Sequence, residues 1–223
     1  MGSDNGAKTA TLDSGLPALT EAEKKSSYGA LFGGVLIPLA VGTGIAFAVY
    51  TFGPKAAYDK RIKVVLGNEL HWVALAIVLL GRTVAIVNMY PATILKGQIM
   101  RRNSGNLRSN PFIYKAIGKD AKENAVVFID DGEVGAYNRA NRSLHHMIEN
   151  YGSLVAGLLL AGNVFAFPVF VATALFAVGR IVHQVGYTTG YGSHGLGFVL
   201  SLIAIVTVEG MLLIVGLKGL KLI

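Results

Sequence analysis

The sequence predicts an all-α membrane protein, built as a bundle of about five transmembrane helices. Charged residues make up only 15% of the 223 residues and the mean hydropathy is +0.52, whereas soluble domains carry about 25% charged residues. The apolar residues are also clustered, because residues 26–54, 150–179 and 181–208 contain no Asp, Glu, Lys or Arg. A helix needs about 20 apolar residues to cross a bilayer, so each of these stretches is long enough to span a membrane.

The composition excludes several functional classes. The chain has no cysteine, so disulfides, thiolate metal sites and a cysteine nucleophile are excluded. His145 and His146 are adjacent and point in different directions on a helix, and no carboxylate cluster has metal-ligand spacing, so we predict no metal site. Basic loops beside lipid headgroups explain the net charge of +7 better than nucleic acid, since aromatic residues do not alternate with the basic clusters. We therefore expect membrane lipids, and no nucleic acid, as partners.

The first predicted element is an apolar helix over residues 28–53, preceded by a polar N-terminal tail, residues 1–27. Within this tail, Thr20 followed by Glu23 forms a capping box, which predicts that a helix begins at Thr20. Gly53-Pro54 ends the helix, because proline cannot continue it. A short basic connection follows the helix before the next apolar run.

Four further spans are predicted within residues 69–217. Trp72 and Tyr90 lie near the two ends of the second span, where interfacial aromatic residues are common. Residues 96–132 form the longest polar segment, and residues 188–195 form a loop with three glycines. The predicted spans two to five cover about residues 70–95, 134–161, 165–187 and 196–217.

A first polar stripe is predicted on the third span. Arg139, Arg142, His146 and Glu149 stand at i, i+3, i+7 and i+10, so they share one narrow face of a helix. Charges that enter an apolar segment are costly unless they pair or line a polar cavity. The alternative is a solvated helical turn at the membrane surface.

A second polar stripe is predicted on the fourth span, where Arg180, His183 and Tyr187 stand at i, i+3 and i+7. If the two helices are antiparallel, both stripes lie at the same membrane level. The alternative for this motif alone is an interfacial tyrosine with an arginine that extends to the membrane surface. Together, the two facing stripes suggest a site for a small anionic or zwitterionic molecule.

Two isolated charges, Arg82 and Glu209, lie near the middle of the second and fifth spans. Because their depths match, we predict that they form a structural pair inside the bundle. The alternative is that each finds a backbone or subunit partner separately.

These motifs resemble a known family. The run Arg139-x-x-Arg142-x-x-x-His146-x-x-Glu149-x-Tyr151 resembles the signature of the MAPEG proteins, the membrane-associated proteins in eicosanoid and glutathione metabolism. The run Gly179-Arg180-x-x-His183-x-x-Gly186-Tyr187 resembles their third-helix motif, and the stretch from Met89-Tyr90 through Gly97-Gln98 to Asn110-Pro111 is similar to the end of their first helix and the following loop. The resemblance covers about residues 69–217, and within the family the chain looks like a microsomal glutathione transferase.

The resemblance implies a four-helix transmembrane domain over residues 69–217 that assembles as a homotrimer and binds glutathione between subunits. It implies that Arg142, Glu149, Arg180 and Tyr187 hold the tripeptide, with His183 matching prostaglandin-synthase-like members. We add Arg139 and His146 to the expected glutathione-binding residues because they share the first stripe. Glutathione carries two carboxylates and one ammonium group, which suits two arginines and one glutamate.

The sequence departs from the family pattern at several positions. His146 stands where the family has asparagine, and Gly152 stands where it has proline. The arginine that favours the thiolate near the start of the family's last helix has no match, since no Lys or Arg occurs between Arg180 and Lys218. Ser193 and His194 stand in that region and are the candidate catalytic residues. The helix over residues 28–53 is an addition to the family's four.

Two functions remain open from the sequence. The first is a glutathione-dependent transferase or peroxidase that acts on lipophilic electrophiles delivered by the bilayer. The second is a non-catalytic relative, which serves as a lipid-binding or scaffold protein or as an accessory subunit of a larger membrane complex. Family resemblance suggests the membrane of the endoplasmic reticulum.

Overall fold

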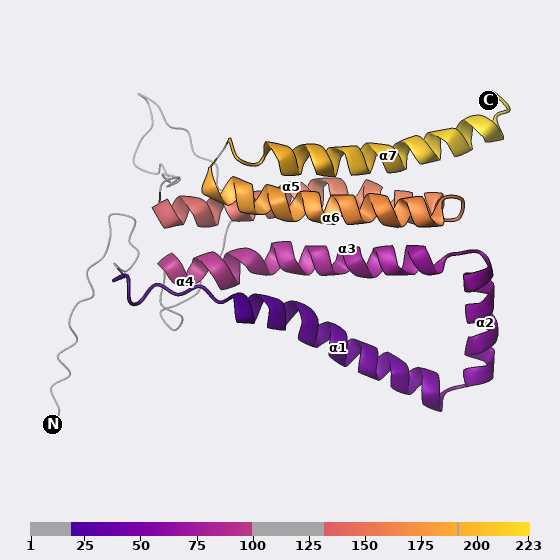
Figure 1. Ribbon diagram of the computed structural model, residues 1–223, viewed down its shortest axis with the longest axis horizontal. Coiled ribbons are helices and arrows are strands. Elements are labelled where there is room, and N and C mark those ends of the chain that lie inside the picture. Colours follow the sequence, from indigo (N-terminus) through magenta and orange to yellow (C-terminus); the bar gives the residue numbers. More distant parts are fainter. Residues whose placement is uncertain (1–18, 100–131, 191) are drawn as a thin grey trace, which may run out of the picture.

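The computed structural model describes residues 19–99, 132–190 and 192–223, and every regular element in these ranges is a helix (Figure 1). The predicted tail up to residue 18 and most of the predicted polar segment at 96–132 lie outside the described residues. The elements are α1 (Tyr28–Phe52), α2 (Lys55–Gly67), α3 (His71–Tyr90), the π-helix η1 (Pro91–Leu95), α4 (Lys96–Ile99), α5 (Gly132–Ala161), α6 (Ala166–Thr189) and α7 (Gly195–Gly219).

The predicted fold class, an all-α membrane bundle, is confirmed. Four helices in the described ranges are long and apolar enough to cross a membrane, namely Tyr28–Phe52, His71–Ile99, Ala166–Thr189 and Gly195–Gly219. The third predicted span coincides with α5, which has 30 residues but is apolar only over Tyr151–Ala161. Its first half carries the charged stripe, so this half of α5 must find polar surroundings.

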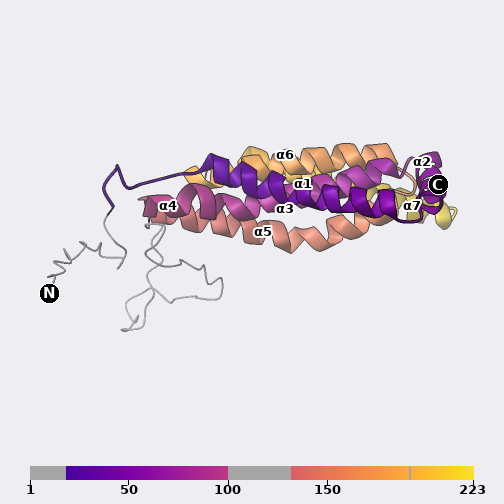
Figure 2. The same ribbon diagram turned by 90° about the horizontal axis from the view of Figure 1, so that it is seen from below.

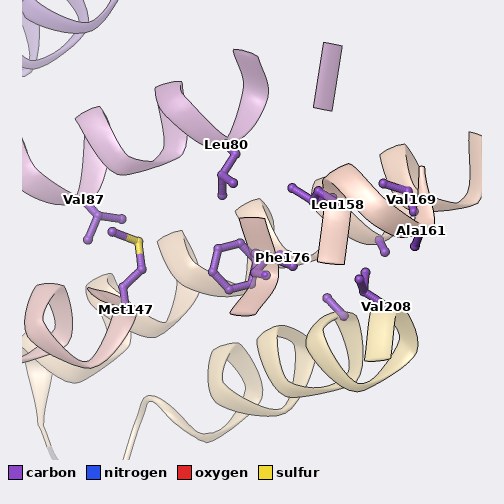
Figure 3. Close-up of a cluster of buried hydrophobic side chains, with 11 residues drawn as sticks. Leu80, Val87, Met147, Leu158, Ala161, Val169, Phe176 and Val208 are labelled. Atoms are coloured by element: carbon purple, nitrogen blue, oxygen red, sulfur yellow. The ribbon is translucent and has the colours of Figure 1, made fainter. Parts of the chain in front are cut away.

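The bundle proper consists of α3, α5, α6 and α7, with α6 in contact with the other three. Side chains from all four helices meet in one apolar core (Figure 3). Phe176 of α6 is fully buried at its centre, between Leu80 of α3 and Val208 of α7. Because lipid is as apolar as these side chains, dense van der Waals packing stabilises the core more than exclusion from water does.

Small residues allow α6 and α7 to lie very close together. A Cβ atom at Gly197 would overlap the backbone of His183, and one at Gly179 would come within 2.7 Å of the Ser201 backbone nitrogen. Close approach of this kind, with small residues at the contact, is typical of membrane helix pairs. It brings the beginning of α7 against the polar stripe of α6.

The chain before α1 is a strap rather than the start of a helix. The predicted capping box does form, since the Thr20 backbone N–H donates to Glu23 Oε2 over 3.0 Å, but the helix does not begin there. It begins at Tyr28, where the Ser27 hydroxyl accepts a hydrogen bond of 3.1 Å from the Ala30 N–H. The prediction of a helix start at Thr20 was therefore wrong, because Ser27 provides the cap.

The strap, residues 19–27, crosses η1 and α4 and is held by backbone hydrogen bonds. The Lys25 N–H donates to the Gly97 carbonyl over 3.0 Å, and the Ser27 N–H donates to the Thr93 carbonyl over 2.9 Å. Lys24 then reaches α5, where its Nζ lies 2.6 Å from Glu133 Oε1. The hydrogen bond from Lys24 lowers the pKa of Glu133, and the same contact raises the pKa of Lys24.

The predicted basic connection after α1 is a helix of 13 residues, α2. It runs across the ends of α1 and α3, at the end of the molecule opposite the strap (Figures 1 and 2). Its sequence has no strong helical periodicity of apolar residues, and none of its residues is buried. This lack of an apolar face explains why the apolar pattern did not predict the helix.

Candidate functional site

The two polar stripes meet at the end of the bundle where α5 begins, α6 ends and α7 begins (Figure 1). The antiparallel course of α5 and α6 places the first half of α5 beside the second half of α6, as the sequence predicted. We call this region the polar end. It contains three arginines, one glutamate, and the aromatic rings of three histidines and one tyrosine.

Arg139 closes the end of α6. Its Nε donates to the Tyr187 carbonyl over 3.1 Å, and its Nη2 donates to the Thr188 carbonyl over 2.9 Å. The last carbonyls of a helix have no partner within the helix and carry its partial negative charge. The guanidinium group donates hydrogen bonds to these carbonyls, and its positive charge is attracted to their partial negative charge. Arg139 therefore anchors α5 to the C-terminal turn of α6.

Arg180 is buried between α6 and α5, with only 2% of its surface exposed. Its Nη2 donates to the Ser143 carbonyl over 2.7 Å, and its Nη1 lies 3.2 Å from His146 Nδ1. Since a guanidinium group can only donate, His146 Nδ1 accepts. Arg180 Nε is buried and has no hydrogen-bond partner among the residues that the structure describes, which leaves one strong donor of a buried cation unused.

His183 connects the two stripes through its ring. Its Nδ1 lies 2.8 Å from the Ser143 hydroxyl, and its ring is stacked on that of His146 with centroids 5.5 Å apart. On the other side, the Tyr187 ring lies 5.6 Å from it. The three rings form a continuous layer from α5 to the end of α6.

His194, at the beginning of α7, completes this layer. Its ring stands edge-on to His183 at 5.2 Å and to Tyr187 at 4.9 Å, and its buried Nδ1 has no hydrogen-bond partner within the described ranges. Ser193 is different, because it is exposed in the preceding turn, and its side chain makes no hydrogen bond to the ring layer in the described part of the chain. Of the two candidate catalytic residues, the structure brings only His194 into the site.

Arg142 and Glu149 lie on the outer edge of the same region. Arg142 Nη1 is 3.0 Å from Glu149 Oε1, and their side chains are 58% and 55% exposed. On the helical wheel they stand on the flank of the stripe, whereas Arg139 and His146 point to α6. The predicted single stripe is thus divided into an inner half that packs on α6 and an outer half that forms a surface ion pair.

The structure contradicts the predicted pair between Arg82 and Glu209 within one chain. Arg82 lies on the side of α3 that faces α1, where its Nη1 donates to the Val35 carbonyl over 2.7 Å. A carbonyl oxygen has two lone pairs, so Val35 can accept from Arg82 in addition to its bond within α1. Glu209 is exposed on α7, and α7 packs on α5 and α6 rather than on α3. Matching depth did not produce a pair because the two helices are not neighbours.

Two functional candidates were missing from the predicted site residues. Ser143 is fully buried and contacts both Arg180 and His183, and Gln184 is buried and donates through Nε2 to the Val87 carbonyl over 2.7 Å. Both stand on the inner faces of their helices, one turn from Arg139 and Arg180 respectively. A helical wheel that included uncharged polar residues would have identified them.

The histidines of the polar end lie close together without forming a metal centre. The rings of His146 and His183 are stacked at an interplanar angle of 10°, so they present faces to each other. Within the described ranges, no three His, Asp or Glu residues are placed so that they could hold a metal ion.

Comparison with known proteins gives one finding. The MAPEG family matches residues 110–214, which include all of α5 and α6 and most of α7. No curated protein and no solved structure matches the chain significantly. The family match covers both polar stripes and the turn that carries His194, and it does not include α1, α2 or α3. Together with the all-helical membrane bundle, it supports membership of the MAPEG family.

Proposed function

We propose that the polar end binds glutathione and that the protein is a glutathione-dependent membrane transferase or peroxidase acting on lipophilic electrophiles. The observation that carries the proposal is Arg180, a buried cation whose Nε has no partner among the described residues. In the same polar end, the buried Nδ1 of His194 also has no hydrogen-bond partner among the described residues. Buried polar atoms are nearly always hydrogen-bonded in native proteins, so an unused donor and an unused ring nitrogen in one site indicate a polar ligand.

The charges of the polar end fit those of glutathione. Arg142 provides a donor fork for one carboxylate, the unused Nε of Arg180 provides a donor for the other, and Glu149 provides the acceptor for the ammonium group. Arg142 and Glu149 pair with each other on the surface, at 3.0 Å. Because an exposed ion pair contributes only about 0–1 kcal/mol, a zwitterionic ligand can exchange both partners at small cost.

The proposed reaction requires the glutathione thiol to lose its proton. His194 Nδ1 is the candidate acceptor, and the Tyr187 hydroxyl is the candidate donor that stabilises the thiolate. In a transfer, the thiolate sulfur forms a bond to an electrophilic carbon, whose leaving group departs with the bonding electrons. In a peroxidase reaction, two glutathione molecules are oxidised to the disulfide while a hydroperoxide is reduced to an alcohol and water.

We also propose a homotrimer with the ligand between subunits. Two observations support an assembly. Arg142 and Glu149 face outward from the single chain, and Glu209 is an exposed carboxylate in an apolar helix. A charged group at that depth requires a polar partner, which a neighbouring subunit or a subunit of a larger membrane complex would provide. By family resemblance, the proposed location is the endoplasmic reticulum.

One observation favours the second function, a non-catalytic MAPEG relative. No Lys or Arg occurs between Arg180 and Lys218, so His194 is the ionisable group at the beginning of α7. A histidine side chain stabilises a thiolate less than a fixed cation does. Such a protein would bind glutathione or a lipid without conjugating it.

A single experiment distinguishes the two functions. The protein is purified in detergent, glutathione binding is measured by calorimetry, and conjugation of a generic aromatic electrophile is followed by absorbance. Binding with conjugation supports the transferase, and binding without conjugation supports the non-catalytic relative. If glutathione does not bind, both the ligand and the enzyme assignment are wrong. Lys63→Ala on α2, at the opposite end of the molecule, is the control variant.

A further inference from the structure

Helix α1 leaves the bundle toward its C-terminal end. Only Leu31 and Val35 are buried on α1, both near its beginning, where they pack beside η1 and α4. Figure 1 shows α1 leaning away from α3 as it approaches α2. The later residues of α1 are apolar and exposed, for example Ile45 at 62% and Val49 at 56%. We call the exposed apolar surfaces of the diverging parts of α1 and α3 the wedge.

The opposite wall of the wedge is also apolar. Arg82 contacts α1, and one and two helical turns before it, Val78 and Leu75 are exposed at 47% and 49% on the same face of α3. Both walls therefore present apolar side chains to the membrane interior. An occupant of this part of the wedge must itself be apolar.

Helix α2 lies at the wide end of the wedge (Figure 1), and it places one cation, Arg61, in the lining of a pocket there. A pocket of about 300 Å³ lies between α1 and α2, lined by Ala46, Val49, Tyr50, Tyr58, Arg61 and Ile62. Tyr50 and Tyr58 are stacked 6.5 Å apart, and the Tyr50 hydroxyl donates to Asp59 over 2.5 Å. Asp59 is the one acidic residue of α2, so the helix has an excess of basic residues, namely Lys55, Lys60, Arg61 and Lys63.

We propose that the wedge is a binding site for one anionic phospholipid, with its phosphate at Arg61 and its acyl chains along α1 and α3. The proposal rests on charge complementarity and on the order of the surfaces: a cation and tyrosine hydroxyls at the membrane boundary, followed by apolar walls. Aromatic residues such as Tyr50 and Tyr58 occupy the same boundary in membrane proteins generally.

Lys63, two residues after Arg61 on α2, provides a matched control for Arg61. Arg61 lines the pocket together with Tyr58 and Ile62, which are three residues before it and one after it. Lys63 is exposed, does not line the pocket, and points away from Tyr58 and Ile62 on the helical wheel. Arg61→Gln and Lys63→Gln therefore remove the same charge from the same helix, and only the first removes it from the pocket.

The test is native mass spectrometry of the full-length protein in detergent with added phosphatidylglycerol or phosphatidylcholine. We expect retention of phosphatidylglycerol over phosphatidylcholine, a loss of about fivefold or more in phosphatidylglycerol affinity in Arg61→Gln, and little change in Lys63→Gln. Ala46→Phe, which keeps every charge and fills the pocket, should also lose the lipid.

Three outcomes would overturn the proposal. Both lipids carry a phosphate, so equal retention would show that the net negative charge of the anionic headgroup is not recognised. Equal losses in Arg61→Gln and Lys63→Gln would show a diffuse basic surface instead of a site. If Ala46→Phe instead changed the oligomeric state and left phosphatidylglycerol bound, the occupant would be a second copy of the chain. None of these outcomes depends on glutathione binding at the opposite end of the molecule.

Discussion

Arg180 and His146 lie opposite each other across α6 and α5, with Arg180 Nη1 3.2 Å from His146 Nδ1. The same guanidinium group donates to the Ser143 carbonyl, so one buried cation joins the two helices at two points. Arg142, one turn before His146 on α5, is instead exposed and pairs with Glu149. The polar end therefore contains a buried arginine that holds the helices together and has its Nε left for a ligand, and an exposed arginine whose surface ion pair a ligand can replace.

The first prediction concerns the buried arginine. Arg180→Ala should lower the free energy of unfolding by on the order of 2–3 kcal/mol, because a hydrogen bond to a buried charged group contributes about this much and the Ser143 carbonyl loses its donor. The check is the thermal unfolding midpoint in detergent, with Arg142→Ala as the control. The exposed pair of Arg142 contributes about 0–1 kcal/mol, so its variant should unfold close to the wild type. Equal destabilisation by the two variants would contradict the division of roles.

The second prediction concerns Arg82 and Glu209, which do not meet within one chain. Arg82→Gln should loosen α1, because Arg82 donates to the Val35 carbonyl over 2.7 Å. Glu209→Gln should leave α1 in place, and the effects of the two changes on unfolding free energy should add within about 0.5 kcal/mol. A double-mutant cycle measures this. A coupling energy well above that value would mean that the two charges pair between subunits.

The third prediction concerns the strap. A Cβ atom at Gly97 would overlap the backbone carbonyl of Lys25, whereas one at Gly34 would overlap only the flexible end of the Met89 side chain. Gly97→Ala should therefore release the strap, and Gly34→Ala should be tolerated after Met89 moves. Limited trypsin digestion at Lys24 and Lys25 is the measurement. If trypsin cleaved Gly34→Ala faster than Gly97→Ala, the prediction that Gly97 holds the strap would be contradicted.

The fourth prediction concerns the pH dependence of the strap. The Lys24 contact lowers the pKa of Glu133 below its ordinary value of 4.5 and raises that of Lys24 above 10.5. The stabilisation of the strap by the Glu133 carboxylate is present above pH 4.5 and is lost as the pH falls through the lowered pKa of Glu133. The stabilisation by the Lys24 ammonium group is present below pH 10.5 and is lost as the pH rises through the raised pKa of Lys24.

A spin label measures this dependence directly. Because the chain has no cysteine, Thr20→Cys gives one labelling position on the strap. The label should be immobile at neutral pH and more mobile in acid, and Glu133→Gln should abolish the change in acid. A label whose mobility changed with pH equally in both proteins would show that another group holds the strap.

Much of the fold followed from the apolar runs, and the exceptions have physical causes. The predicted spans coincide with α1, α3, α5, α6 and α7, since length and hydropathy decide which segments cross a bilayer. Helix α2 was predicted as a connection because it has no apolar face that the pattern could reveal. The start of α1 was misplaced because the Thr20–Glu23 capping box forms without beginning a helix, and α1 begins instead after its N-cap, Ser27.

The site was predicted in part. The spacing of Arg180, His183 and Tyr187 correctly placed them together, since i, i+3 and i+7 positions share one helix face. Spacing could not separate the inner and outer halves of the α5 stripe, because that division depends on where α6 packs. It also could not reveal that Arg82 contacts a backbone carbonyl of α1, which is a tertiary contact with no sequence signature.

The central claim, that the polar end binds glutathione through its outer ion pair and its buried arginine, is tested most directly by calorimetric titration of glutathione into wild type and Arg142→Ala. We predict that the wild type binds glutathione and that Arg142→Ala does not, although the variant remains as stable as the wild type. Unchanged binding in a folded Arg142→Ala protein, or no binding by the wild type, would contradict the claim.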